Sequence, residues 1–473
     1  MSGSLLLRAA GRADGSVCDL RIVSGRIVAS DWQLMKQPGE SVLDACGAAV
    51  IRGLHDHHVH LLASARALDS LVCGPPAVRD EDALARVLRN ACPGADGWIR
   101  GTGFHDSVAP GVDRRWLDRL CPVHPLRIQH RSGMLWILNS AALAALGMER
   151  DAELPAGVER LADGTPSGRC FGVDAWLGER LGVQPPDLRA LGGRLAGYGV
   201  TGVTDAGVRN GPAEWELLAA AQLRGELPQR VLLMGSEALD GMAVDGDHIA
   251  RGPLKIYLRE AEFEAFDVLV ARVRAAHALG RDCAFHCVTR AELVVALAAL
   301  EAAGVRAGDR IEHAAVCDDE ALGWIVRLGL RVVGQPHFVA ERGERYRVEV
   351  EPADRPWLWR AAAFLAAAVP FAAGTDAPYG SLDPWQAMRA AVSRCTADGE
   401  CLGRDEVLAP QQAVQLFCGD PRLPGTGSPW PEVGDRADLC VLDLPWRELL
   451  DDLDSRHVRA TLIDGVVVHQ RAG

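Results

Sequence analysis

Residues 53–60 read Gly-Leu-His-Asp-His-His-Val-His and end the first of eight apolar runs on which the predicted fold rests. Two histidines two positions apart on a strand point to the same side, so His58 and His60 can reach one ion. Imidazole and carboxylate groups suit zinc or a similar divalent metal. A His-x-His pair alone is a weak signal, because a histidine at a strand end is more often a hydrogen-bonded structural residue.

Seven more strand-like runs follow and alternate with helix-like stretches such as 291–303 and 318–328. With residues 49–55 they give eight strands separated by helices, the count of a (β/α)8 barrel, or TIM barrel, in the α/β class. An open doubly wound sheet is the alternative, but no glycine-rich phosphate loop opens an early helix. The seven runs are Val200–Asp205, Arg230–Gly235, Leu254–Leu258, Cys283–Cys287, Arg310–His313, Arg331–Gln335 and Pro370–Thr375.

The two ends of the chain resemble each other and differ from the middle. Both contain short strand-like runs separated by Gly and Asp, and neither end is long enough to bury a core alone. We therefore expect residues 1–48 and 425–473 to form one small composite β-sandwich, with the barrel over 49–424 between them. Extra strand-like segments before the second barrel strand predict an insertion over about 75–195.

Composition argues against several classes of partner. The 473 residues carry a formal net charge of −13, which disfavours nucleic acid or an anionic membrane as the main partner. No apolar run reaches the roughly 18 residues that a membrane span needs, and the start lacks a signal-peptide pattern. The 13 cysteines include no Cys-x-x-Cys pair and suit a reducing cytoplasm. We expect a cytoplasmic protein with a small-molecule substrate, and leave a homodimer open.

Lysine is almost absent from the chain. Of the 50 Lys and Arg residues only Lys36 and Lys255 are lysine, so 50 − 2 = 48 are arginine. A GC-rich coding sequence explains the ratio as a whole. It does not explain why a lysine remains at position 255, in the fourth barrel strand. Arginine easily replaces an exposed lysine, but it cannot replace a lysine whose amine must lose a proton.

Residues suited to metal chemistry end several of the predicted strands. Catalytic groups of a barrel lie at the C-terminal ends of its strands, so side chains at these ends are expected to meet. Besides His58 and His60, they are Lys255 in strand four, His286 in strand five, Glu312-His313 in strand six and Asp376 after strand eight.

In this order, the residues resemble those of the amidohydrolase superfamily, and more closely the branch of metal-dependent amidohydrolases that includes N-substituted formamide deformylases. The similarity covers nearly the whole chain. The family pattern Gly-hydrophobic-x-Asp-x-His-x-His matches residues 53–60, and its Gly-Ser-Asp-x-Pro matches 374–378 with threonine in place of serine. Lys255, His286 and the Glu312-His313 pair match the family's residues on strands four to six.

The resemblance implies divalent metal ions, with zinc as the expected metal and one or two ions per chain. Lys255, carboxylated by CO2, would bridge two ions as a carbamate, which arginine cannot form because it cannot lose its proton. Asp376 would be a metal ligand and the general base. The remaining ligands would be His58 and His60 for a first ion, and His286 and His313 for a second.

The implied reaction is hydrolysis of a C–N amide-type bond of a small molecule, an N-substituted formamide or N-acyl amine, by metal-activated hydroxide. Such an enzyme is an amidohydrolase acting on carbon–nitrogen bonds other than peptide bonds. The alternatives are a cyclic amide (lactam) hydrolase or a deaminase on the same scaffold and, more remotely, a non-catalytic scaffold protein. Lys255 argues against the deaminase, because mononuclear deaminases of the superfamily generally lack this lysine.

Other candidate residues surround this set. His337 opens a charged loop that runs to Pro356, and we expect it to assist catalysis by binding the substrate or transition state. His55 and His57 form a competing His-x-His pair, which we set aside because the family places an aspartate two residues before its first ligand. The expected substrate contacts are His130, Arg131, Trp136 and Asn139 in the insertion, and Tyr257 and Arg259 after Lys255.

Overall fold

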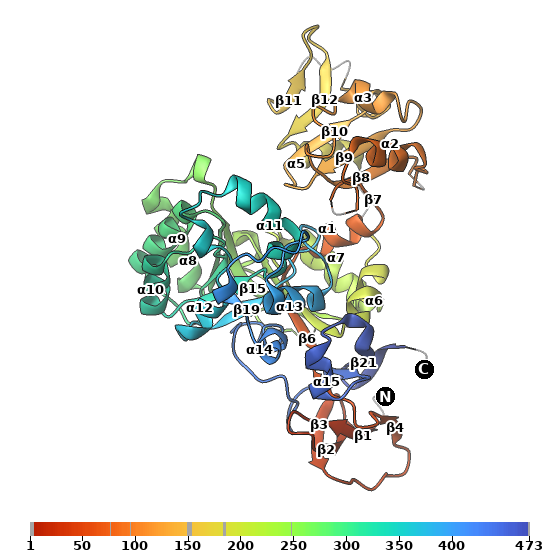
Figure 1. The fold of residues 1–473 in the computed structure, drawn as a ribbon, viewed down its shortest axis with the longest axis vertical. Helices are drawn as coiled ribbons and strands as arrows, with labels where there is room; N and C mark the ends of the chain where they lie inside the picture. Colours follow the sequence, from red (N-terminus) through yellow and green to blue (C-terminus); the bar gives the residue numbers. More distant parts are fainter. Residues whose placement is uncertain are drawn as a thin grey trace. The chain divides into compact units, whose positions relative to one another are not determined.

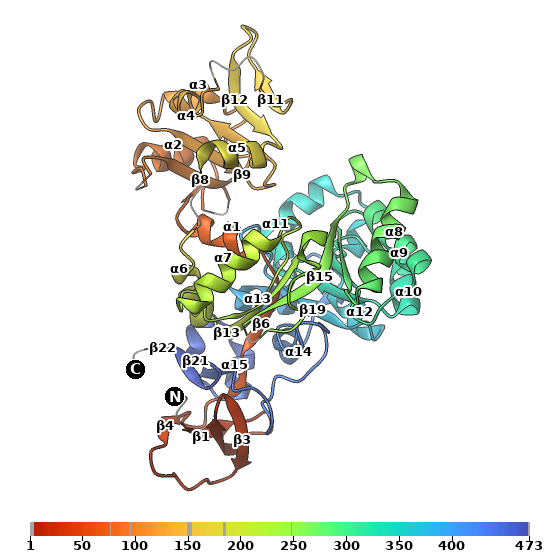
Figure 2. The same cartoon turned by 180° about the vertical axis from the view of Figure 1, so that it is seen from behind.

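The chain folds into two compact units, which Figures 1 and 2 show from opposite sides. One unit comprises Met1–Leu61 and Leu188–Gly473, and the other comprises Leu62–Asp187. The computed structural model describes residues 4–75, 77–94, 96–148, 154–182, 186–246 and 248–471.

The first unit contains the predicted barrel. Eight parallel strands form one sheet in the order β19-β18-β17-β16-β15-β14-β13-β6, and helices cover its outer face (Figures 1 and 2). The α/β class and the (β/α)8 barrel are therefore confirmed. The strands are β6 (Leu54–Val59), β13 (Val200–Asp205), β14 (Arg230–Gly235), β15 (Ile249–Tyr257), β16 (Cys283–Cys287), β17 (Arg310–His313), β18 (Arg331–Gly334) and β19 (Phe371–Ala373). The helices are α6 (Arg189–Gly197), α7 (Pro212–Leu223), α8 (Phe266–Ala278), α9 (Arg290–Ala303), α10 (Asp319–Leu328), α11 (His337–Glu349), α12 (Ala361–Ala366), α13 (Pro384–Ser393) and α14 (Pro410–Gln415).

The first and last strands of the barrel meet at a seam just beyond their C-terminal ends. The backbone N–H of Asp376 donates to the carbonyl of His58 at 2.7 Å, and the N–H of His60 donates to the carbonyl of Ala377 at 2.9 Å. Gly374 permits this approach, because a Cβ built there would lie 2.4 Å from the Cβ of His58. The seam therefore brings the histidine-rich end of β6 beside the segment after β19.

The two chain ends form two four-stranded sheets that share one core. Leu7, Leu20 and Ile22 pack there with Leu439 and Leu462, so the sandwich assembled from both ends is present. One sheet contains β3 (Arg26–Asp31), β2 (Val17–Val23), β1 (Leu5–Gly11) and β4 (Ser41–Asp44), and the other contains β22 (Val466–Gln470), β21 (Val458–Ile463), β20 (Leu439–Leu442) and β5 (Val50–Arg52). Helix α15 (Trp446–Asp451) follows β20.

The run predicted as one strand over 49–55 is two strands in the structure. β5 pairs with β20 of the sandwich, whereas β6 pairs with β13 of the barrel, and Gly53 separates them. A Cβ at Gly53 would lie 2.2 Å from the Cγ2 of Thr201, so only glycine fits where the chain passes from one sheet to the other. The sandwich therefore extends past residue 48, where the sequence analysis ended it.

The second unit, Leu62–Asp187, begins before the insertion predicted over about 75–195, covers most of it, and has its own sheet and cores. Its strands, in sheet order, are β11 (Val158–Arg160), β12 (Pro166–Phe171), β10 (Leu135–Leu138), β9 (Leu126–His130), β8 (Ile99–Phe104) and β7 (Leu71–Val72). Its helices are α2 (Glu81–Arg89), α3 (Arg114–Asp118), α4 (Ser140–Ala145) and α5 (Asp174–Leu181), and α1 (Leu61–Leu68) connects it to β6.

The segment after β18, predicted as a loop, is mostly the helix α11. The buried face of this helix carries His337, Phe338, Val339 and Gly343. The charged residues on its other face are the reason that the sequence predicts a loop here.

Among the described residues, every helix is too short or too polar to span a lipid bilayer.

Gly374→Ala tests the seam. The added methyl group would collide with His58, so we expect the unfolding free energy to fall by about 2 kcal/mol, within the usual cost of overpacking. Urea unfolding of the full chain measures this. Gly323→Ala in α10 is the control, because a Cβ there meets nothing closer than Arg327 at 4.0 Å. Equal stability of the two variants would contradict the role of the seam.

Candidate metal centre

Three side chains from the two sides of the seam converge. His58 lies in β6, His60 follows that strand, and Asp376 follows β19. Asp376 Oδ1 is 3.1 Å from His60 Nε2 and 3.6 Å from His58 Nε2. One potential ligand atom from each residue lies within 4.8 Å of the others, so the three could hold one metal ion.

Two more histidines extend this cluster. The ring centroid of His313 is 4.8 Å from that of His58 and 4.5 Å from that of His286. His286 lies in β16 and His313 ends β17, where the parallel register places them one step apart. The structure therefore brings together all four histidines that the sequence proposed as ligands, at the C-terminal ends of barrel strands.

The backbone departs from regular strand geometry at this cluster. The pairing of β6 with β13 shifts by one residue, because Val203 faces Asp56 but Asp205 faces Val59. Such bulges re-aim side chains and are frequent beside active sites. His313 has a φ of +72° and Asp376 a φ of +50°, a region that residues other than glycine rarely adopt.

Glu312, which the sequence places among the strand-end residues without a role of its own, orients His58. Glu312 Oε2 accepts a hydrogen bond from His58 Nδ1, which leaves His58 Nε2 free on the side of Asp376. Arg310 Nε donates to Glu312 Oε1, and Arg310 Nη2 donates to the carbonyl of His57 at 3.0 Å. Burial raises the pKa of Glu312, but Arg310 and Lys255 lower it, and the net pKa lies well below its usual range.

The positive φ of His313 explains why the alternation of side chains along a strand does not predict the contact of Glu312 with His58. Consecutive residues of a strand point to opposite faces. The left-handed turn at His313 instead lets both residues contact His58, Glu312 by a hydrogen bond and His313 by its ring. Gln335, after β18, fixes the other side of His313 through a 2.7 Å contact between its Oε1 and His313 Nδ1.

Lys255 lies in β15 and is 2% exposed. Its Nζ has no hydrogen-bond partner among the described residues. Burial lowers the pKa of Lys255, while Glu312 and Asp376 raise it, and the net pKa is below the usual value. A buried ammonium without hydrogen bonds is costly, so the neutral amine is favoured relative to an exposed lysine.

The carboxylate of Asp376 is surrounded by imidazoles. Burial raises its pKa, but the hydrogen bond from His60 and the nearby His58 and His313 lower it, and the net pKa lies below the usual value. Asp376 is therefore ionised at neutral pH and can accept a proton or bind a cation.

A second aspartate, Asp56, supports the loop that carries Asp376. Its Oδ1 accepts hydrogen bonds from the N–H of Thr375 at 2.9 Å and the N–H of His58 at 3.1 Å, and its Oδ2 accepts one from the Thr375 hydroxyl. Complete burial raises the pKa of Asp56 to about 7. Asp56 therefore ties the two sides of the seam together and is not one of the three residues that could hold an ion.

The competing pair His55 and His57 lies elsewhere. His55 Nε2 is 2.8 Å from the hydroxyl of Thr204, and its side chain lines a separate cavity of about 500 Å³ beside the N-terminal ends of β13 and β14. His57 is fully buried, and neither ring nitrogen has a partner among the described residues. Neither histidine belongs to the group with Asp376 that could hold an ion.

His337 lies behind the Asp376 loop. It is 1% exposed, and its Nε2 donates to the carbonyl of Thr375 at 2.9 Å. This contact holds the backbone next to Asp376 and gives His337 a positioning role. Its catalytic role stays a prediction.

Aromatic side chains flank the histidines. The Tyr257 ring lies 4.3 Å from that of His286, and the Arg259 guanidinium lies 5.3 Å from the Tyr257 ring centre. Tyr379, which the sequence analysis did not single out, lies 5.4 Å from the His60 ring. Tyr257 therefore lies beside the cluster and Arg259 beside Tyr257, and their roles as substrate contacts stay predictions.

The other candidate substrate contacts belong to the Leu62–Asp187 unit. Asn139 is fully buried and caps α4, and its amide bonds four backbone groups, those of Leu126, Ala142, Cys121 and His124. This corrects the expectation for Asn139, because no polar atom of its side chain remains for a substrate. The Trp136 indole donates to Asp174 at 2.9 Å, and His130 Nδ1 contacts Ser132 at 2.8 Å. The substrate roles of His130, Arg131 and Trp136 stay predictions.

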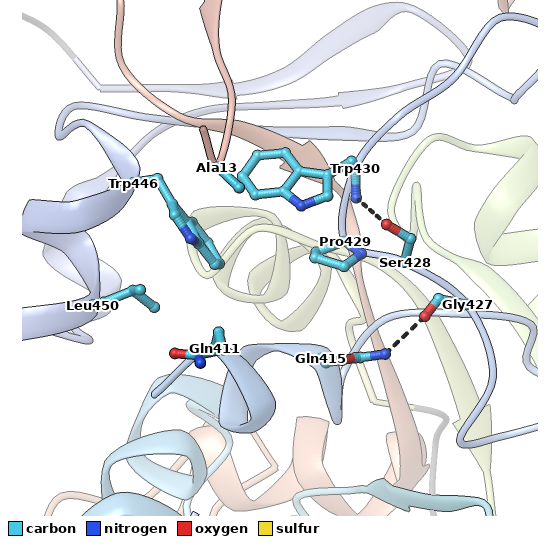
Figure 3. Close-up of a pocket in the computed structure, with 9 residues that line it drawn as sticks. All are labelled: Ala13, Gln411, Gln415, Gly427, Ser428, Pro429, Trp430, Trp446 and Leu450. Atoms are coloured by element: carbon cyan, nitrogen blue, oxygen red, sulfur yellow. Dashed lines mark hydrogen bonds between the residues drawn. The ribbon is translucent and has the colours of Figure 1, made fainter. Parts of the chain in front are cut away.

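A cavity of about 520 Å³ lies elsewhere in the barrel unit, beside α14 and α15 (Figure 3). Its two tryptophans, Trp430 and Trp446, meet edge to face with ring centres 4.9 Å apart. Gln415 Nε2 donates to the carbonyl of Gly427 at 3.0 Å. The lining contains no ionisable side chain, so general acid–base or metal chemistry is not available there. The histidine cluster remains the candidate active site.

Comparison with known proteins identifies the family of the chain. The sequence pattern of the amidohydrolase family matches residues 41–469, which is most of the chain. The chain belongs to the amidohydrolase family. As an amidohydrolase it is a hydrolytic enzyme acting on carbon–nitrogen bonds other than peptide bonds, and the enzyme class and the resemblance inferred from the sequence are confirmed.

This amidohydrolase is similar to several known proteins along almost its whole length. It is 27% identical to N-substituted formamide deformylase of Arthrobacter pascens, in a match that covers 92% of this chain and 91% of that protein. An uncharacterized metal-dependent hydrolase from Pyrococcus horikoshii OT3 has a similar structure, with a TM-score of 0.72, 18% identity and coverage of 98% and 99% of the two chains. One from Pyrococcus furiosus gives a TM-score of 0.71, 20% identity and coverage of 93% and 99%.

Arg310→Met tests the buried support of the amidohydrolase site. Without Arg310, Glu312 keeps a buried charge that lacks its partner, and we expect the unfolding free energy to fall by about 3–5 kcal/mol. Denaturant unfolding measures the loss. Arg345→Met is the matched control, because Arg345 pairs with Glu349 in a partly exposed pair on α11, and such pairs contribute about 0–1 kcal/mol. An equally small effect of both variants would refute the supporting role of Arg310.

Proposed function

We propose that this amidohydrolase cleaves an amide-type C–N bond of a small molecule, an N-substituted formamide or N-acyl amine, with one or two divalent ions, zinc foremost, at the histidine cluster. The convergence of His58, His60 and Asp376 on one point carries this proposal. The similarity to a formamide deformylase over most of both chains supports the choice of bond. The predicted cytoplasmic location stays a prediction.

The donor chemistry of the cluster fits a divalent cation. The imidazole Nε2 atoms of His58 and His60 and a carboxylate oxygen of Asp376 are the ligand types that zinc prefers. Glu312 holds His58 by Nδ1, the arrangement by which a carboxylate fixes the orientation of a ligating histidine. His286 and His313 would serve a second ion next to the first.

Lys255 fits the role of a bridging group once it is carboxylated. Its buried Nζ has no hydrogen-bond partner among the described residues, and its pKa is lowered by burial. A neutral amine adds to CO2, forming an N–C bond and releasing one proton, and the resulting carbamate has two anionic oxygens. An ammonium at the same place would repel a cation, whereas a carbamate would bind it.

The side chains of this chain then have distinct tasks. The metal, when bound, supplies polarisation of the scissile carbonyl and a lowered pKa for water. Asp376, ionised and beside His60, accepts the proton of the attacking water and delivers it to the departing amine nitrogen. Asp56 and His337 hold the backbone on either side of Thr375, so that the Asp376 carboxylate keeps its place. Tyr257 and Arg259 contact the substituent of the substrate.

Lys255→Arg separates a bridging role from a merely basic one. We expect the variant to bind fewer ions than the wild type and to lose at least about 100-fold in kcat/KM, more than the loss of an outer hydrogen-bond partner usually costs. Metal content is measured by plasma mass spectrometry. In parallel, 13C-bicarbonate should give a carbamate signal in the wild type alone.

Lys36→Arg is the matched control for this experiment. Lys36 is the chain's other lysine and is exposed, so the same substitution there should change neither metal content nor activity. Wild-type metal content and activity in Lys255→Arg would refute the bridging role.

A substrate panel tests the reaction itself. Metal-depleted enzyme is reloaded with zinc or manganese and offered N-formyl amines, N-acetyl amines, lactams and cyclic amidines, with amine or ammonia release as the readout. We expect turnover of the N-formyl or N-acyl compounds, loss of activity on chelation and recovery on reloading. Ammonia release from amidines or exclusive lactam opening would favour the alternative reactions, and full activity without metal would overturn the proposal.

A further inference from the structure

A pair of cysteines faces each other across a short hairpin after α13. Cys395 and Cys401 form an antiparallel bridge, and their Sγ atoms are 3.5 Å apart. The hairpin turns at Ala397-Asp398, where the N–H of Gly399 donates to the carbonyl of Thr396 at 2.9 Å and the N–H of Thr396 donates to the carbonyl of Glu400 at 2.8 Å. Directly paired residues of antiparallel strands have Cβ atoms about 4.5–5.5 Å apart, close to the roughly 3.5–4.5 Å that a disulfide takes, so a small approach of the two strands would allow the bond.

We propose that Cys395 and Cys401 form a reversible dithiol–disulfide site. Both side chains are partly exposed, so a small oxidant can reach them. Among the 13 cysteines, all of which lie in the described residues, they form the one pair with a sulfur–sulfur contact. Cys46 and Cys92 are exposed but have no such partner, and the other nine cysteines are buried.

The oxidant in this reaction is a low-molecular-weight disulfide such as oxidised glutathione. One protein thiolate attacks this disulfide, forming a mixed disulfide and releasing one small thiol. The second protein thiolate then attacks the protein sulfur of the mixed disulfide, forming the Cys395–Cys401 bond and releasing a second small thiol. Two electrons pass from the protein to the small disulfide, and the two thiol protons end on the released thiols.

The hairpin that would be locked packs on α11. Gly343 of α11 leaves space for Thr396, whose Cγ2 would lie 2.2 Å from a Cβ at that position. Arg347 of α11 pairs with Asp398. Arg394, at the start of the hairpin and 1% exposed, donates to the carbonyls of Leu402, Trp359 and Leu358.

Helix α11 in turn contacts the loop that carries Asp376. Arg342 donates to the carbonyl of Tyr379, and Glu341 accepts a hydrogen bond from the N–H of Ser381 at 3.0 Å. The dithiol site therefore lies one packed element away from the catalytic loop, so oxidation constrains the outer support of that loop.

Treatment of the full-length protein with oxidised glutathione, followed by peptide mapping, tests the proposal. We expect a Cys395–Cys401 cross-link with a mass loss of about 2 Da for the two hydrogens removed, and no glutathione on either residue. Cys46 and Cys92 are internal controls, because exposed thiols without a partner should keep a glutathione adduct. Reduction with a dithiol should remove the cross-link.

Two single variants complete the test. In Cys395→Ser and in Cys401→Ser, the remaining cysteine should retain a glutathione adduct, since no second thiol can displace it. Hydrogen exchange at residues 394–402 should be slower in the cross-linked wild type than in its reduced form. A stable adduct on either cysteine of the wild type, or unmodified thiols there while Cys46 and Cys92 react, would overturn the proposal.

Discussion

Closure of the barrel at one seam is the constraint on which the rest of this structure depends. Two backbone hydrogen bonds join His58 and His60 to the segment around Asp376, and Gly374 makes room for them. The same contacts that complete the fold bring a His-x-His motif and a carboxylate from opposite ends of the barrel sequence to within about 3–4 Å. The closure of the barrel and the geometry of the candidate metal site thus depend on the same contacts.

Much of this arrangement could be predicted because it depends on patterns that are visible in the amino-acid sequence itself. The eight strands of a barrel with helices on its outside are buried on both faces and read as apolar runs, and their last residues must meet at one end. The positions of His58, His286, His313 and Asp376 follow from that rule. Lys255 stands out for another reason. It is one of only two lysines among the 50 Lys and Arg residues of the chain.

What the sequence did not reveal depends on local backbone geometry and on partners distant in the chain. Alternation along a strand cannot foresee that a positive φ at His313 turns both Glu312 and His313 toward His58. The sequence predicts Gly53 within one strand, although the close approach of Thr201 makes it the break between two sheets. The sequence predicts a substrate contact at Asn139, yet its four backbone hydrogen bonds give it a capping role.

The central claim is that this cluster, and no other part of the barrel, holds the ion used in hydrolysis. Anomalous diffraction from crystals of the full-length protein grown with zinc, recorded on both sides of the zinc absorption edge, tests it most directly. We predict a strong anomalous peak bounded by His58 Nε2, His60 Nε2 and the Asp376 carboxylate, with density for a carboxylated Lys255 beside it. Zinc bound only elsewhere, with His58, His60 and Asp376 in contact with one another and no peak between them, would contradict the account.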